Sequence, residues 1–101
     1  RCGLKTITIV NNNHCLSQGL KNLNIAYGSR EQGRKSECYV YLETDFAKIA
    51  QSFDCFGITV EKPGDFKAAF AAALASELPA VIDVKTEFAY QAEMAWIPGA
   101  K

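Results

Sequence analysis

Three consecutive asparagines followed by the chain's single histidine are the residues best suited to chemistry in this sequence. Asn11, Asn12 and Asn13 come directly after the segment Thr6-Ile7-Thr8-Ile9-Val10. This β-branched composition is typical of a strand that is buried on at least one face. In an open α/β sheet, ligands bind beyond the carboxyl ends of the strands. We therefore expect the three amides to lie at that edge of a sheet.

The asparagine run has two interpretations. An amide oxygen is a neutral, hard donor that suits a cation such as Mg²⁺, which prefers oxygen ligands and often keeps phosphates and waters as the others. Asparagine is also common in turns, because its side chain bonds to its own backbone and tolerates left-handed conformations. On the residue types alone the turn is the commoner of the two. The asparagines by themselves leave both interpretations open.

The four cysteines favour free thiols over a metal site. Cys2, Cys15, Cys38 and Cys55 form no Cys-x-x-Cys pair, and His14-Cys15 is the only close combination of zinc-type ligands. Disulfides persist mainly in oxidising compartments, so we expect reduced thiols and a cytoplasmic protein. A catalytic Cys–His pair has weak support, since sequence neighbours point apart on a strand or helix.

Composition limits the possible functions. The chain has 101 residues, of which 49% are hydrophobic, so we expect at most one domain with a packed core. Its 11 basic and 11 acidic residues cancel. No basic stripe is interleaved with aromatic residues, which argues against nucleic-acid binding. No apolar run approaches the ~20 residues of a membrane span.

Alternating strand and helix patterns predict an α/β fold with a parallel sheet and flanking helices. Thr44 is expected to cap the first long helix, with Asp45 in its first turn. The predicted strands lie near residues 4–10, 57–61 and 80–85, the main helices near 45–53 and 65–77, and a shorter helix near 14–24.

The start of the sequence is unusual, because Arg1-Cys2-Gly3 runs almost directly into a predicted core strand. A strand needs a partner on at least one edge. We expect this chain to be a fragment, a cleavage product or the ordered part of something longer. Residues 87–101 have no clear period and are expected to pack as a tail against another surface.

The order of these features resembles the C-terminal, diphosphate-binding domain of thiamine diphosphate enzymes, in particular the acetolactate synthase and 2-oxo acid decarboxylase group. The resemblance runs in register over residues 1–86, and it implies that residues 1–101 are part of that domain, with 87–101 as its tail. The segments that carry it are Ile9–Asn13, Thr44–Phe53, Gly57–Val60, Pro63 with Asp65-Phe66, and Pro79–Val84.

The resemblance implies roles for individual residues. Position by position, the side chain of Asn12 and the backbone carbonyl of His14 would hold Mg²⁺, which carries the diphosphate of the cofactor. Three residues that follow would line the cofactor channel, and Gln18 would reach the substrate. Asn13 occupies a variable position and receives no role. The channel residues are Cys15, Leu16 and Ser17.

The chain also departs from the family pattern. The Gly-Asp-Gly half of the cofactor motif does not occur in it, and is expected upstream of Arg1. The catalytic glutamate of the family belongs to another domain of a partner subunit. The implied protein is a thiamine diphosphate- and Mg²⁺-dependent lyase or transferase that decarboxylates or ligates 2-oxo acids as a homodimer or homotetramer. This chain alone would be inactive.

A different class of function stays open. The chain would then be a small non-catalytic α/β interaction or regulatory module, and the asparagine run would be only a turn. Cofactor and Mg²⁺ binding by the full-length protein distinguishes the two.

Overall fold

A three-stranded parallel sheet organises the chain. The computed structural model describes residues 3–28 and 35–87. The strands lie in the order β1-β3-β2, and both ladders are parallel. The expected α/β fold with a parallel sheet is therefore confirmed. The strands are β1 (Ile7–Asn12), β2 (Phe56–Val60) and β3 (Ala80–Lys85).

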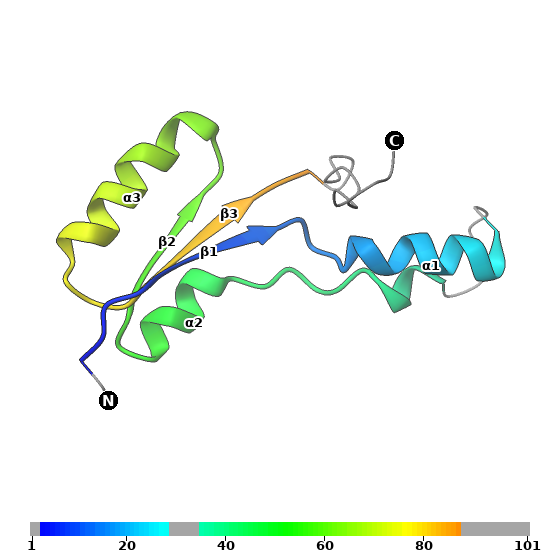
Figure 1. The fold of residues 1–101 in the computed structure, drawn as a ribbon, viewed down its shortest axis with the longest axis horizontal. Coiled ribbons are helices and arrows are strands. Elements are labelled where there is room, and N and C mark those ends of the chain that lie inside the picture. The colour runs from blue at the N-terminus through cyan, green and yellow to red at the C-terminus, as the bar shows by residue number, and fades with distance from the viewer. Residues whose placement is uncertain (1–2, 29–34, 88–101) are drawn as a thin grey trace, which may run out of the picture.

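Two of the helices flank the sheet. In Figure 1, α2 (Phe46–Ser52) and α3 (Phe66–Ala75) lie on opposite sides of the strands, whereas α1 (Ser17–Tyr27) extends away beyond the strand ends. Short 3₁₀ helices, η1 (Lys35–Cys38) and η2 (Pro63–Asp65), precede α2 and α3 in the chain. Residues 88–101 of the tail expected at 87–101 lie outside the described residues.

The side of the sheet that faces α3 is the apolar core. Alternate residues of a strand point to the same face, and Ile82 of the central strand has no exposed surface. It packs in one cluster with Val60, Ala69, Ala73 and Ala80. The small alanine side chains let α3 approach the sheet closely, so the alanine-rich helix expected from the sequence is suited to this contact.

The opposite side of the sheet carries α2 and is more polar toward the strand ends. Gly57 lies directly beneath α2, and a Cβ atom placed on it would be 2.1 Å from the backbone oxygen of Ala47. Asp83 of β3 also faces this helix, because its carboxylate accepts a hydrogen bond from the backbone N–H of Phe46. Helix α2 therefore packs against the sheet through its own backbone.

The predicted cap of α2 is wrong by one residue. The N-cap is Asp45, whose backbone is extended and whose Oδ1 accepts a hydrogen bond from the N–H of Lys48 at 2.9 Å. The hydroxyl of Thr44 instead donates to the carbonyl of Leu42. Both residues are good caps, and the helix begins at Phe46, where Asp83 accepts the first free N–H.

Two boundaries near the asparagine run also differ from the predictions. Strand β1 begins at Ile7 and continues through Asn12, because β3 extends far enough to pair Asn12 with Lys85. The following helix begins at Ser17 and not at His14. His14 has a left-handed backbone, with φ of 62°, and cannot start a right-handed helix.

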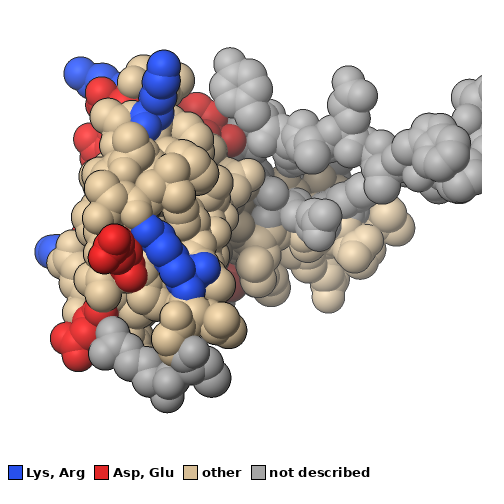
Figure 2. Space-filling model, turned by 60° about the vertical axis from the view of Figure 1, so that its left-hand side comes forward, with Lys and Arg blue, Asp and Glu red and all other residues tan. Residues whose placement is uncertain are grey.

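Charged side chains of both signs lie on the face of the molecule shown in Figure 2, and much of the remaining surface there is uncharged. Within residues 3–28 and 35–87, no helix is long and apolar enough to cross a membrane.

Candidate functional site

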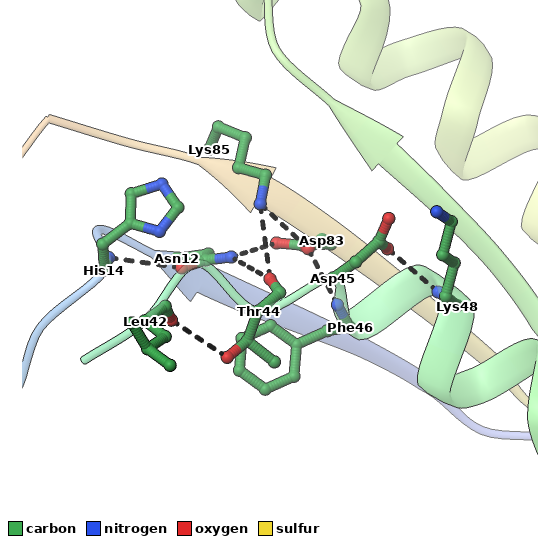
Figure 3. A network of polar contacts seen from close by, with 9 residues as sticks. All are labelled: Asn12, His14, Leu42, Thr44, Asp45, Phe46, Lys48, Asp83 and Lys85. Carbon is green, nitrogen blue, oxygen red and sulfur yellow. Dashed lines mark hydrogen bonds and ion pairs between the residues drawn. The ribbon is translucent and has the colours of Figure 1, made fainter.

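The side chain of Asn12 is held on all sides at the carboxyl end of β1. It has no exposed surface. Its Nδ2 donates to Asp83 Oδ1 at 3.0 Å and to the carbonyl oxygen of Thr44 at 3.2 Å. Its Oδ1 accepts from the backbone N–H of His14 at 3.2 Å (Figure 3). Because the first two partners accept hydrogen bonds and the third can only donate, the amide has one consistent orientation.

Asp83 is the centre of this group of contacts and has no exposed surface. Its Oδ2 accepts from the backbone N–H of Phe46 at 3.1 Å and lies 3.5 Å from Lys85 Nζ. The Lys85 amine also contacts the Thr44 carbonyl at 3.4 Å (Figure 3). We call Asn12, Thr44, Asp83 and Lys85 the Asn12–Asp83 network.

The interpretation of the sequence missed Asp83, Thr44 and Lys85 as parts of the site. One signal for Asp83 was present: it is a charged residue inside the apolar strand Ala80–Val84. A buried aspartate is rare unless it is paired. Its position therefore implied a partner, although nothing near it in the sequence identifies Asn12.

The loop after β1 is built from two successive asparagine turns. Asn12 Oδ1 bonds to the N–H of His14, and Asn13 Oδ1 bonds to the N–H of Cys15 at 3.3 Å. The turn interpretation of the asparagine run is therefore correct for the local geometry. The turn places the backbone carbonyl of His14 so that it accepts from the N–H of Tyr41 at 3.1 Å.

The residues around Tyr39 and Val40 hold this loop from the other side. The N–H of Leu16 donates to the Tyr39 carbonyl at 2.7 Å. Cys15 is buried and pairs with Val40 in an isolated antiparallel bridge. The loop that carries the predicted ligands is thus fixed by backbone contacts to a segment about 25 residues later.

A cleft of about 770 Å³ lies where the three strands end. Of Asn12, His14, Cys15 and Leu16, the residues with predicted roles whose side chains the structure describes, only His14 lines it. Asn12 and Cys15 are buried, and Leu16 is 68% exposed elsewhere. Ser17 and Gln18 begin α1, and their side chains lie outside what the structure describes. The cleft is lined by Asn13, His14, Glu61, Pro63, Lys85, Thr86 and Glu87.

The oxygens of this loop are of the type that a hard divalent cation prefers as ligands. Asn12 Oδ1 and the His14 carbonyl are neutral oxygens, and each accepts one hydrogen bond from a backbone N–H. A carbonyl oxygen has two lone pairs, so each retains one for a metal. Asn12 has no exposed surface, so a cation would reach its oxygen only if neighbouring atoms made room. Two oxygens are fewer than Mg²⁺ requires, so phosphates, water or other protein groups must supply the rest.

Two further observations bear on the site. The Nδ1 atom of His14 is buried and has no hydrogen-bond partner in the structure, so its imidazole does not fix the loop through that atom. Across the described ranges, 3–28 and 35–87, no three His, Cys, Asp or Glu side chains gather as a metal cluster.

Comparison with known proteins identifies the family. The family model for the thiamine pyrophosphate enzyme, C-terminal TPP binding domain, matches residues 1–84. A search of curated proteins gave no match to the chain. The family model covers most of the chain, including the whole sheet up to Val84 and the Asn12–Asp83 network except Lys85. This chain therefore belongs to the family of C-terminal TPP-binding domains of thiamine pyrophosphate enzymes.

Proposed function

We propose that this chain supplies part of the diphosphate and Mg²⁺ site of a thiamine diphosphate-dependent enzyme that acts on 2-oxo acids. The reaction would be a decarboxylation or carboligation, as in acetolactate synthase-like lyases and transferases. The observation that carries the proposal is the fixed amide of Asn12, whose oxygen faces the loop at the carboxyl end of β1. In the resemblance described above, Asn12 corresponds to the ligand position of the family pattern, and the match of the family model to residues 1–84 supports that resemblance.

In this proposal the protein binds and orients the cofactor. Asn12 Oδ1 and the His14 carbonyl would bind Mg²⁺, and the hydrogen bond from the His14 N–H to Asn12 Oδ1 keeps these two residues close together. Lys85 lines the cleft with a side chain that is 20% exposed. Its charge is paired with Asp83, and Glu61 and Glu87 line the same cleft, so the positive charge that a diphosphate needs there would come from the bound cation. When bound, thiamine diphosphate supplies the stabilisation of a carbanion.

The remaining roles follow the family pattern. Cys15, Leu16 and Ser17 form the wall of the cofactor channel, and Gln18 contacts the substrate. The backbone bonds of the loop to Tyr39 support this arrangement, because they hold the chain just before α1.

Three alanine variants of the full-length protein test the metal site. Asn12→Ala removes one ligand, and the affinity for thiamine diphosphate at fixed Mg²⁺ should fall at least ~10-fold, the scale for losing support at a metal site. Asn13→Ala is the matched control: it removes an amide whose oxygen accepts the N–H of Cys15 and to which the family pattern gives no ligand role, so it should change the affinity much less. His14→Ala should be intermediate, since its backbone carbonyl remains.

Titration by calorimetry gives the affinities. Asn12→Ala also leaves buried acceptors on Asp83 and Thr44 without their donor, so thermal unfolding must show that the variant is folded. If folded Asn12→Ala binds the cofactor as tightly as the parent, the ligand assignment is wrong. If the parent itself binds no thiamine diphosphate, the non-catalytic module is the better description.

We also propose that the chain works within a larger assembly that includes the rest of the enzyme and a second subunit. Large apolar side chains are widely exposed on the described residues, and surfaces of this kind mark interaction sites. Light scattering of the full-length protein should give the mass of a dimer or tetramer, and a stable monomer would contradict the proposal. The most exposed are Leu4, Leu16, Ile25, Leu42 and Phe53, at 68–89%.

A further inference from the structure

We propose that Asp83 is a positioning residue for the cation site: its carboxylate holds the Asn12 amide in place with the amide oxygen facing the loop and the metal. This inference rests on the proposed function, because it concerns the orientation of a ligand in that site. Asp83 lies on the central strand and does not line the cleft. It would act on the metal only through Asn12.

The contacts of the carboxylate fix the direction of the amide. One oxygen accepts from Asn12 Nδ2 at 3.0 Å, and the other accepts from the backbone N–H of Phe46 at 3.1 Å. The Thr44 carbonyl is a second acceptor for the same nitrogen, at 3.2 Å. The amide nitrogen therefore faces inward and the oxygen outward, toward the N–H of His14. A reversed amide would place NH₂ against that N–H, donor against donor.

Replacing the carboxylate by an amide of the same shape removes this control. In Asp83→Asn the new side chain has only one acceptor oxygen for three donors, which are the Asn12 NH₂, the Phe46 N–H and the Lys85 amine. The N–H of Phe46 belongs to the backbone and cannot turn over, so the oxygen is retained there. The new NH₂ group then faces the NH₂ of Asn12, donor against donor. Turning the Asn12 amide over would only exchange this clash for two others, with the Thr44 carbonyl and with the His14 N–H. The Asn12 side chain is therefore pushed from its place, and the proposed ligand oxygen loses its fixed position.

Asp45→Asn is a matched control for the same chemical change at the same helix. Asp45 also accepts a backbone N–H of α2, that of Lys48 at 2.9 Å. In the structure it makes no hydrogen bond to Asn12. Asparagine is as good an N-cap as aspartate, so this variant should keep the parent's stability and its affinity for the cofactor.

The test uses the full-length protein that contains these residues. Thiamine diphosphate is titrated over a series of Mg²⁺ concentrations, with thermal unfolding of each variant measured in parallel. We expect Asp83→Asn to weaken Mg²⁺-dependent binding ~10-fold or more, the scale found for groups that orient a metal ligand. Asp45→Asn should bind as the parent does.

A double variant separates positioning from general damage. Because Asp83 acts through Asn12, Asn12→Ala with Asp83→Asn should bind about as well as Asn12→Ala alone, so the two losses do not add. Asp83→Glu keeps two acceptor oxygens and should bind more tightly than Asp83→Asn, although it is the bulkier change. If Asp83→Asn does not fold, the cofactor affinity of Asp83→Glu is measured in its place.

The outcomes separate this inference from the proposed function. If the parent binds no cofactor with Mg²⁺, the proposed function fails and the inference fails with it. If the parent binds but folded Asp83→Asn has the parent's affinity, only the inference is overturned. Additive losses in the double variant, or a loss in folded Asp83→Glu as large as that in Asp83→Asn, overturn it as well, because they show an effect that does not depend on how the carboxylate holds the Asn12 amide.

Discussion

Replacing Gly57 by alanine measures how closely α2 rests on the backbone of β2. The added Cβ would lie 2.1 Å from the carbonyl oxygen of Ala47, 2.8 Å from its carbonyl carbon and 2.9 Å from its Cα. All three are backbone atoms, so no change of rotamer relieves the contact. Carbon atoms normally pack at about 3.5–4.0 Å, and α2 must therefore move outward by about 1 Å.

The cost of this movement follows from what α2 holds. Overpacking a well-packed site costs about 1–3 kcal/mol, and occasionally more. We expect about 3 kcal/mol for Gly57→Ala, because the backbone cannot yield locally. The first turn of α2 also donates the Phe46 N–H to Asp83. The displaced helix should therefore disturb the Asn12–Asp83 network and weaken cofactor binding too.

Hydrogen exchange of the β2 amides in the full-length protein measures the effect. A loss of about 3 kcal/mol in stability corresponds to an approximately 100-fold increase in the equilibrium constant for the opening that exposes these amides, since each 1.4 kcal/mol is tenfold. Gly19→Ala is the control: its Cβ would meet no atom within 4 Å, and alanine inside a helix should stabilise α1 by about 0.5–1 kcal/mol. If the exchange rates of the β2 amides in Gly57→Ala stay within about threefold of those in the parent, the close contact is refuted.

The start of α2 and the loop after β1 give two further predictions. Asp45→Ala should cost about 1 kcal/mol because it removes the N-cap bond to Lys48, whereas Thr44→Ala should stay within about 0.5 kcal/mol; denaturant unfolding that ranks them the other way would contradict the cap assignment. His14→Gly should unfold at a higher temperature than His14→Ala, by about 1 kcal/mol in stability, because glycine accepts the left-handed φ of 62° without the cost of a Cβ. Equal melting temperatures for these two would show that the loop relaxes to another conformation.

The sheet and its helices could be predicted because their signals are local. The β-branched run of β1, the Ala80–Val84 segment and the apolar stripe of α3 each form the expected element, and the parallel pairing is confirmed. Neighbouring residues in the sequence do not decide whether Thr44 or Asp45 caps α2. Both are good caps, and the helix begins where Phe46 meets Asp83, 37 residues away.

The site was predictable only in part, because some of its contacts join residues that lie far apart in the sequence. The asparagine run indicated both a turn and a carbonyl-type ligand, and the structure contains the turn. The burial of Asn12 was not expected, because β1 was predicted to end before the asparagines. How far β1 extends depends on its pairing with Lys85. A buried Asp83 signalled that it needed partners, but a sequence pattern cannot name a partner 71 residues away.

That separation of 71 residues between Asn12 and Asp83 sets an order of events during synthesis. Ribosomes add about 5–20 residues per second, so Asn12 is made roughly 4–14 s before Asp83. Until then the asparagine run has its turn-forming neighbours but lacks the carboxylate that directs its amide. A polypeptide that stops short of residue 83 would contain both proposed ligand residues and still lack an ordered ligand. The proposed cation site would thus be completed only when residue 83 has been added, by a residue that does not line the cleft.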